Sequence, residues 1–336
     1  MLIEPGTVFA ERWVIDEPLA SGSTSEVFRG HERASGEPAA IKVLLPEFAD
    51  DAQALQRFQR EARVAQRLAH PNIVAVRDFG VDRGHPWLAM ELLEGETLEL
   101  RLQREHLAPA LVLDVIDQIA AAVDHAHGLG VVHRDLKPDN CFLVAGADPL
   151  RVKVLDFGFA KLLDALESDG LKTASNAVLG TPLYMAPEQV RSSATVDPRA
   201  DLWSLGVVAY ELLVGDAPFP GRSAADLFVQ ILSRPVDAPS ARNAALPVPL
   251  DRWAARALDR DPARRFGSAA ELARALRAAM DPRFAHHAAA VTAPHAAVNA
   301  KPPARNAKAP ARAFAVAALV ALAVATVVAL AVAWAR

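Results

Sequence analysis

Cysteine is almost absent from this sequence, since Cys141 is the only one among 336 residues. A lone thiol forms no internal disulfide and no cysteine-cluster metal site, which fits a reducing cytoplasm. The excess of one sign of charge over the other is also small. The formal net charge of −4 argues against a nucleic-acid-binding protein that works by neutralising phosphates. Residues 1–6 lack a basic and an apolar segment, so we expect no secretory signal there.

A long hydrophobic run occurs at residues 314–334, and it contains no charged side chain. About 20 apolar residues suffice to cross a bilayer as a helix, and the Leu, Val and Phe residues of this run together favour insertion by roughly −3 to −6 kcal/mol. A buried helix of a soluble domain is the alternative, but the run has no polar face. We therefore expect a transmembrane helix, which makes the lipid bilayer a partner of the chain.

The segment ahead of this run, residues 282–313, is rich in Ala, Pro and basic residues. It has too few large apolar side chains to fold, so we predict a disordered juxtamembrane linker. Its last basic residues are Lys301, Arg305, Lys308 and Arg312. The positive-inside rule therefore predicts a single-pass protein of the cell membrane, with the preceding domain in the cytoplasm and residues 335–336 as a short extracytoplasmic tail.

Alanines recur at a spacing of four along the hydrophobic run. They are Ala317, Ala321, Ala325, Ala329 and Ala333. Small residues on one helix face allow two membrane helices to pack closely, so a homodimer is one interpretation. The other interpretation is that the spacing arises only from the alanine-rich composition of the run and that no partner helix packs there.

Before the linker, the hydrophobic pattern divides into two parts. Short apolar runs with β-branched residues predict strands at 13–15, 39–43 and 87–90. Helical spacing of apolar residues predicts helices at 52–68, 111–127 and 200–214. We therefore predict an α+β fold with a small β-rich lobe that ends at a hinge, residues 1–93, and a larger α-helical lobe, residues 94–281.

The strongest signal is a set of short motifs in a fixed order. They are Ala40-Ile41-Lys42, the helical Glu61, His133-Arg134-Asp135-Leu136-Lys137-Pro138-Asp139-Asn140, Asp156-Phe157-Gly158 and Ala186-Pro187-Glu188. A single motif alone would be a coincidence more often than not, but for the ordered set the chance interpretation falls below about one in a hundred. The set resembles the protein kinase superfamily. The sequence of residues 180–189, together with Lys137, is most similar to the bacterial eukaryotic-like (Hanks-type) serine/threonine kinases.

The resemblance covers about residues 10–280 and implies the bilobal protein kinase fold. It also implies transfer of the γ-phosphate of ATP to Ser and Thr hydroxyls of protein substrates, a reaction that needs positioning and charge neutralisation. Lys42 would hold the α- and β-phosphates, aimed by an ion pair with Glu61. Asp135 would accept the proton of the substrate hydroxyl, and Lys137 would lie near the γ-phosphate.

The same resemblance assigns a metal site and a nucleotide pocket. Asn140 and Asp156 match the metal ligands of the family, for Mg²⁺ or alternatively Mn²⁺, because these ions prefer oxygen ligands. The pocket residues would be Ala20 and Gly22 in the phosphate loop, Val27 and Ala40 in the roof, Lys42 at the phosphates, Met90 as gatekeeper, Glu91 and Leu93 at the hinge, and Phe142 in the floor.

The phosphate loop departs from the family pattern G-x-G-x-x-G. Residues 19–27 keep only the middle glycine, Gly22. Glycine lets backbone N–H groups approach phosphates closely, so the departure leaves a second interpretation open, a pseudokinase that acts as a membrane-tethered nucleotide-binding scaffold. Retention of the whole catalytic set favours the active enzyme.

Further residues are predicted to regulate or support the site. Thr173 and Ser175 stand where the bacterial family carries autophosphorylation sites, and Arg134 would bind the added phosphate. An unmodified polar loop is the alternative. In the large lobe the resemblance implies that Asp201 braces the catalytic-loop backbone and that Glu188 pairs with Arg265.

Overall fold

The first structural unit of the chain, residues 1–291, contains every residue that the computed structural model describes. The described ranges are 3–22, 25–44, 52–157, 182–191, 197–221 and 223–281. Within these ranges no helix has the length and apolar character needed to cross a membrane. The linker and membrane helix predicted from the sequence lie outside the described residues.

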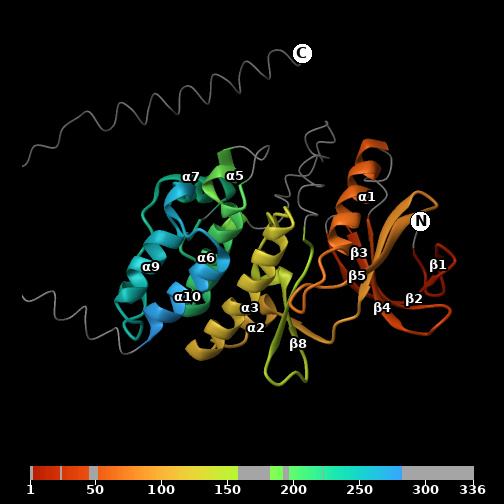
Figure 1. The fold of residues 1–336 in the computed structure, drawn as a ribbon, viewed down its shortest axis with the longest axis horizontal. Helices are drawn as coiled ribbons and strands as arrows, with labels where there is room; N and C mark the ends of the chain where they lie inside the picture. The colour runs from red at the N-terminus through yellow and green to blue at the C-terminus, as the bar shows by residue number, and fades with distance from the viewer. Residues whose placement is uncertain are drawn as a thin grey trace, which may run out of the picture. The chain divides into compact units, whose positions relative to one another are not determined.

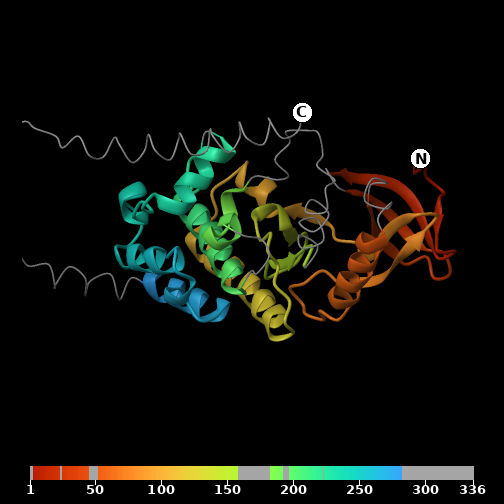
Figure 2. The same cartoon turned by 90° about the horizontal axis from the view of Figure 1, so that it is seen from above.

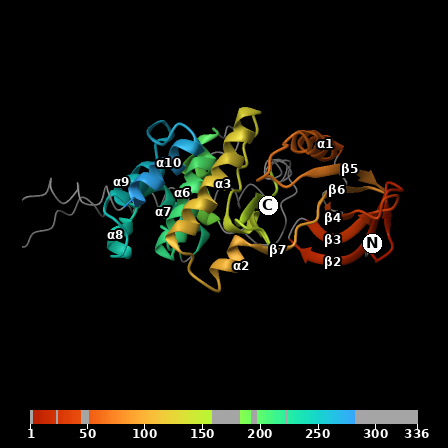
Figure 3. The same cartoon turned by 60° about the horizontal axis from the view of Figure 1, so that its bottom comes forward.

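A six-stranded antiparallel sheet builds the amino-terminal lobe (Figure 1). Its strands are β1 (Val8–Phe9), β2 (Trp13–Ser21), β3 (Ser25–Glu32), β4 (Pro38–Leu44), β5 (Val76–Asp82) and β6 (His85–Glu91). They lie in the order β1-β2-β3-β4-β6-β5. Helix α1 (Ala52–Gln66) follows β4 in the chain and lies beside β5 (Figure 3).

The two faces of this sheet bury different side chains. One face buries a mostly aromatic and β-branched cluster of Phe9, Trp13, Ile15, Phe28, Ala39, Ile41, Val43, Trp87 and Ala89. The other face packs against α1 through Leu44, Phe58, Ala62, Ala65 and Leu88. Successive strand residues point to opposite faces, which explains why apolar residues occur at alternating positions along β4.

Strand register determines which face carries the predicted site residues. Val27 on β3 pairs with Lys42 on β4, and Lys42 pairs with Leu88 on β6. Two residues away on each strand, and so on the same face, Ala40 pairs with Met90. Directly opposite residues share a face, so these predicted nucleotide-binding residues all lie on the face that packs against α1.

The carboxy-terminal lobe combines helices with a three-stranded sheet of order β7-β8-β9. These strands are β7 (Gly95–Thr97), β8 (Cys141–Val144) and β9 (Arg151–Val154). Its described α-helices are α2 (Leu98–Leu102), α3 (Pro109–Gly128), α5 (Pro187–Arg191), α6 (Arg199–Val214), α7 (Ala224–Ser233), α8 (Pro239–Arg242), α9 (Pro249–Ala257) and α10 (Ala269–Met280). Its described 3₁₀ helices are η2 (Pro138–Asn140), η3 (Pro182–Tyr184) and η4 (Pro262–Arg264).

Helix α6 forms the centre of this lobe. Its sequence is apolar on all sides, and almost every residue of it is buried, as expected of a core helix. Helices α3, α9 and α10 pack around it (Figure 2). An added Cβ on Gly206 would lie 3.1 Å from the Cβ of Ala257, so a glycine allows α9 to approach α6 closely.

The coarse organisation predicted from the sequence is confirmed. The predicted helices 52–68, 111–127 and 200–214 are α1, α3 and α6, with small shifts at their ends. The predicted strands lie within β2, β4 and β6. A β-rich lobe is thus followed along the chain by a helical lobe that presents α6 and the loop before β8 to the site.

Candidate active site

Two charged side chains from different lobes meet at the site. Lys42, on β4, donates a hydrogen bond from Nζ to Oδ1 of Asp156 at 2.7 Å. Asp156 follows β9 and has a φ of 56°, a conformation that few non-glycine residues adopt. The Lys42 side chain is only 13% exposed. The structure therefore holds a partly desolvated cation in contact with a carboxylate.

The electrostatic surroundings keep Asp156 ionised. Burial acts to raise the pKa of Asp156, but the charge and hydrogen bond of Lys42, with smaller contributions from His133 and Lys137, outweigh burial and lower this pKa below its ordinary value. A carboxylate that is ionised at neutral pH is a competent metal ligand, because metal binding requires the deprotonated form.

A second group of polar side chains lies between His133 and β8. Lys137 donates a hydrogen bond from Nζ to Oδ2 of Asp135 at 2.8 Å. Asn140 donates from Nδ2 to the backbone oxygen of Asp135 at 2.7 Å and to its Oδ2 at 3.1 Å. The Asp135 side chain is 49% exposed. Its carboxylate is thus held in one orientation while it stays open to a hydroxyl group arriving from solvent.

Asp201, at the start of α6, fixes the backbone of this loop. Its fully buried carboxylate accepts hydrogen bonds from the N–H groups of His133 and Arg134, both at 2.8 Å, and contacts Nε2 of His127 at 2.7 Å. A buried carboxylate is tolerated only with such partners. Arg134 adopts a φ of 70°, and Gln189 donates to its carbonyl oxygen at 2.8 Å. The predicted bracing role of Asp201 is confirmed.

Comparison with known proteins identifies the fold that carries this arrangement. Residues 13–276 match the family model of the protein kinase domain. The chain belongs to the protein kinase family.

Named relatives agree with the family match. The chain is 39% identical over 276 residues to serine/threonine-protein kinase PknL of Mycobacterium tuberculosis, which covers 80% of this chain and 67% of PknL. It is 36% identical over 302 residues to serine/threonine-protein kinase pkn3 of Myxococcus xanthus, covering 86% of this chain and 55% of pkn3. The chain thus spans about two thirds of PknL and about half of pkn3.

A solved structure agrees as well. The crystal structure of the Mycobacterium tuberculosis PknI kinase domain superposes with a TM-score of 0.65 at 31% identity, covering 83% of this chain and all of that one. Together, these similarities make the chain a serine/threonine protein kinase of the bacterial Hanks type, with the bilobal kinase fold. They give no support to the pseudokinase alternative.

The kinase family uses ATP with a divalent metal ion, and the residues present fit such an ion. The N–H of Leu155 donates to the carbonyl oxygen of Asn140 at 2.8 Å, which brings Asn140 beside Asp156. Among the described residues, the contacts given above use Oδ1 of Asp156 and Nδ2 of Asn140, which makes Asp156 Oδ2 and Asn140 Oδ1 the candidate ligands. Among the described residues, no cluster of three His, Cys, Asp or Glu side chains could hold a metal. Two protein oxygens suit a metal ion that is shared with nucleotide phosphates.

The structure positions the predicted nucleotide-binding residues as follows. Ala20 pairs with Val27 across β2 and β3, and the N–H of Gly22 donates to the carbonyl oxygen of Ser25 at 2.8 Å. Glu91 is the last residue of β6, and Leu93 follows in the hinge. Phe142 lies on β8, where an added Cβ on Gly95 would approach its ring to 3.0 Å. Their contacts with ATP stay predictions.

Two other expectations are untested. Glu61 lies half-buried on α1, and its predicted ion pair with Lys42 stays a prediction. The predicted phosphorylation sites Thr173 and Ser175 lie outside the described residues, which stop at Phe157 and resume at Pro182.

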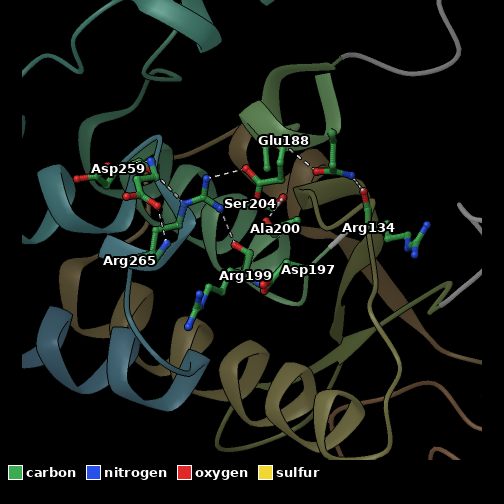
Figure 4. A network of polar contacts seen from close by, with 12 residues as sticks. Arg134, Glu188, Asp197, Arg199, Ala200, Ser204, Asp259 and Arg265 are labelled. Carbon is green, nitrogen blue, oxygen red and sulfur yellow. Dashed lines mark hydrogen bonds and ion pairs between the residues drawn. The ribbon is translucent and has the colours of Figure 1, made fainter. Parts of the chain in front are cut away.

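The predicted ion pair in the large lobe is confirmed (Figure 4). Arg265 donates from Nη1 and Nη2 to the two carboxylate oxygens of Glu188 at 2.7 and 2.8 Å. Its guanidinium also donates to the backbone oxygens of Arg199 and Asp259, each at 2.8 Å. The bidentate pair ties α5, which follows Ala186, to the loop before α10.

Sequence reasoning missed several residues that support the site. His127 contacts Asp201, and Gln189 holds the carbonyl of Arg134. Tyr184 donates from its hydroxyl to Oε2 of Glu211 at 2.7 Å, which attaches η3 to α6. His127 stands on the helical pattern of α3 and Gln189 follows the Ala186-Pro187-Glu188 motif. For Gln189, the neighbouring motif was the one signal that could have drawn attention to it, and His127 had no such signal.

Proposed function

We propose that this kinase transfers the γ-phosphate of ATP to Ser and Thr hydroxyls of protein substrates, with Mg²⁺ as the metal ion. The observation that carries the proposal is the pair of polar contacts described above, Lys42 with Asp156 and Lys137 with Asp135. The first joins the lobes at a cation that suits nucleotide phosphates. The second prepares a carboxylate beside a cation, as transfer to a hydroxyl requires.

Each residue has a separate task in this proposal. Oδ2 or Oδ1 of Asp135 accepts the hydroxyl proton of the substrate, and the hydrogen bonds from Lys137 and Asn140 keep the carboxylate aligned. Lys42 neutralises charge on the α- and β-phosphates, while Lys137 neutralises charge that develops on the transferred group. Asp156 and Asn140 would hold the Mg²⁺ ion, which would supply further neutralisation of phosphate charge.

Transfer of label from [γ-³²P]ATP to protein tests this function. Full-length wild type with Mg²⁺ should label Ser and Thr of a generic basic protein substrate, and Asp135→Asn should lower the rate by about 10²- to 10⁴-fold. Asp139→Asn is the matched control, because Asp139 is an exposed carboxylate in the same motif. Parallel reactions with Mn²⁺ or EDTA identify the metal. Equal rates for wild type and Asp135→Asn would disprove the assigned role.

We also propose that the kinase phosphorylates Thr173 or Ser175 in its own activation segment. The family resemblance of this segment supports the proposal, and Arg134 is near enough in sequence to Asp135 to couple an added phosphate to the catalytic loop. Mass spectrometry of protein purified after incubation with ATP should find phosphate on one of the two residues. Active protein with both residues unmodified would refute it.

We propose further that residues 314–334 anchor the kinase in the cell membrane with the catalytic domain in the cytoplasm. The uncharged run and the basic residues before it support this topology. Full-length protein should then sediment with membranes, and a version ending at residue 313 should not. Dimerisation through the alanine face is a separate proposal. Ala325→Leu should weaken cross-linking in bilayers if the two helices pack there.

A further inference from the structure

A little-exposed ion pair joins the hinge to the carboxy-terminal lobe. Glu91 is the last residue of β6 and precedes the hinge, whereas Lys153 lies on β9. Lys153 Nζ lies 2.5 Å from Oε1 of Glu91, and the two side chains are only 11% and 22% exposed. Charges placed this far from water interact more strongly than surface charges. The proposed transfer reaction uses neither of these side chains.

Additional hydrogen bonds extend this pair to the segment before β5. The N–H of Ala75 donates to the same Oε1 of Glu91 at 2.7 Å, and the N–H of Glu91 donates back to the carbonyl oxygen of Ala75 at 3.0 Å. Lys153 Nζ also donates to the carbonyl oxygen of Ile73 at 3.2 Å. The carboxylate and the ammonium group therefore connect three segments, the hinge, residues 73–75 and β9.

Residues 72–75 are themselves bound to β9. The N–H of Val74 donates to the carbonyl oxygen of Val154 at 3.0 Å, and the N–H of Val154 donates to that of Asn72 at 2.8 Å. The side chain of Asn72 donates to the carbonyl oxygen of Val152 at 2.8 Å. Through these contacts the hinge carboxylate is attached, by two routes, to the strand that leads into Asp156.

We propose that Lys153 is a positioning residue for the adenine base. Its ion pair with Glu91 sets the distance between the hinge backbone at residues 91–93 and Asp156, which stands three residues after Lys153 and just beyond the end of β9. One nucleotide must reach both places, with its base at the hinge and its phosphates near Asp156 and Lys42. Loss of the pair removes one of the two routes that attach the hinge to β9 and so loosens the hinge, which weakens the base contacts and spares the phosphate contacts. This inference rests on the proposed binding of ATP.

The test compares two ligands that differ in the base. Isothermal titration of the full chain measures the Kd of Mg-ATP and, separately, the Kd of Mg-tripolyphosphate, which has no base. Lys153→Met should raise the Kd of ATP about tenfold, within the usual range of coupling between sites, and should change that of tripolyphosphate less than twofold. Lys153→Arg should restore most of the ATP affinity. Arg151→Met, an exposed substitution on the same strand, is the matched control.

Glu91→Gln is the second variant, because it removes the charge and keeps an acceptor for Ala75. It should produce the same base-specific loss even if Lys153→Met does not fold. An equal loss for both ligands would show a merely structural role, and unchanged ATP affinity would overturn the proposal outright. If wild type itself fails to bind ATP, the proposed kinase function fails instead, so the two failures are distinguishable.

Discussion

Glu188→Ala should reveal how strongly the large lobe depends on one ion pair. The Arg265 side chain is 0% exposed, and Glu188 accepts two of its hydrogen bonds (Figure 4). Removing one partner of a buried pair typically costs about 3–5 kcal/mol. Arg265 keeps two backbone acceptors and lies 5.1 Å from the centre of the Trp203 ring, so we expect the lower end, about 3 kcal/mol. For a domain of this size that loss lowers Tm by about 6–12 °C.

Thermal unfolding followed by circular dichroism measures this change. Asp216→Ala is the matched control, since Asp216 is 73% exposed in its ion pair with Arg242 and should contribute less than about 1 kcal/mol. Adding Arg265→Met to Glu188→Ala should destabilise less than the sum of the single variants, because no charge is then stranded. Equal Tm values for Glu188→Ala and Asp216→Ala would refute the reasoning.

Three further predictions concern single contacts. Lys42→Met removes the main attraction that lowers the pKa of Asp156. A lowered carboxyl pKa stabilises the folded protein at pH values above the ordinary carboxyl pKa of about 3.9. This stabilisation is lost as the pH falls through the pKa of Asp156 in the folded protein. Urea unfolding should therefore show a wild-type advantage at pH 7 that shrinks toward pH 3. Gly95→Ala should destabilise the protein by about 2 kcal/mol or more in the same assay. Gly95 has a φ of 144°, and an added Cβ would lie 2.0 Å from the carbonyl oxygen of Leu143. Gly146→Ala is the control, because an added Cβ there meets no atom within 4 Å, so it should cost less. Tyr184→Phe strands the carboxylate of Glu211, whose pKa burial already raises, and should cost about 1–3 kcal/mol; an unchanged Tm would contradict this.

Residue types that chemistry dictates were predictable from the sequence. Lys42 and Asp156 stand in ordered motifs that predict a common site, and the structure brings their side chains into contact. The roles of Lys42, Asp135 and Asp156 as cation, proton acceptor and metal ligand stay predictions. Helix α6 was predictable because residues 200–214 form a long, mostly apolar run. The bidentate pair between Glu188 and Arg265 could be predicted from the family pattern as well.

Contacts between residues that are distant in the sequence and belong to no recognised motif were not predictable from residue types. Lys153 lies on an ordinary short strand, and its partner Glu91 is 62 residues away. His127 has no motif of its own, and it meets Asp201 only because α3 packs against α6. Such pairs depend on the register of β9 and on helix packing, which emerge only when the whole domain has folded.

The central claim is that Lys42 and Asp156, joined across the lobes, act together on the phosphates of one nucleotide. Initial rates of γ-phosphate transfer by Lys42→Met, Asp156→Asn and the double variant test it most directly. Each single variant should lose about 10²-fold or more, and the double should be little slower than the worse single, because groups that act as a unit are not additive. Wild-type rates in either single variant, or losses that multiply in the double, would contradict the claim.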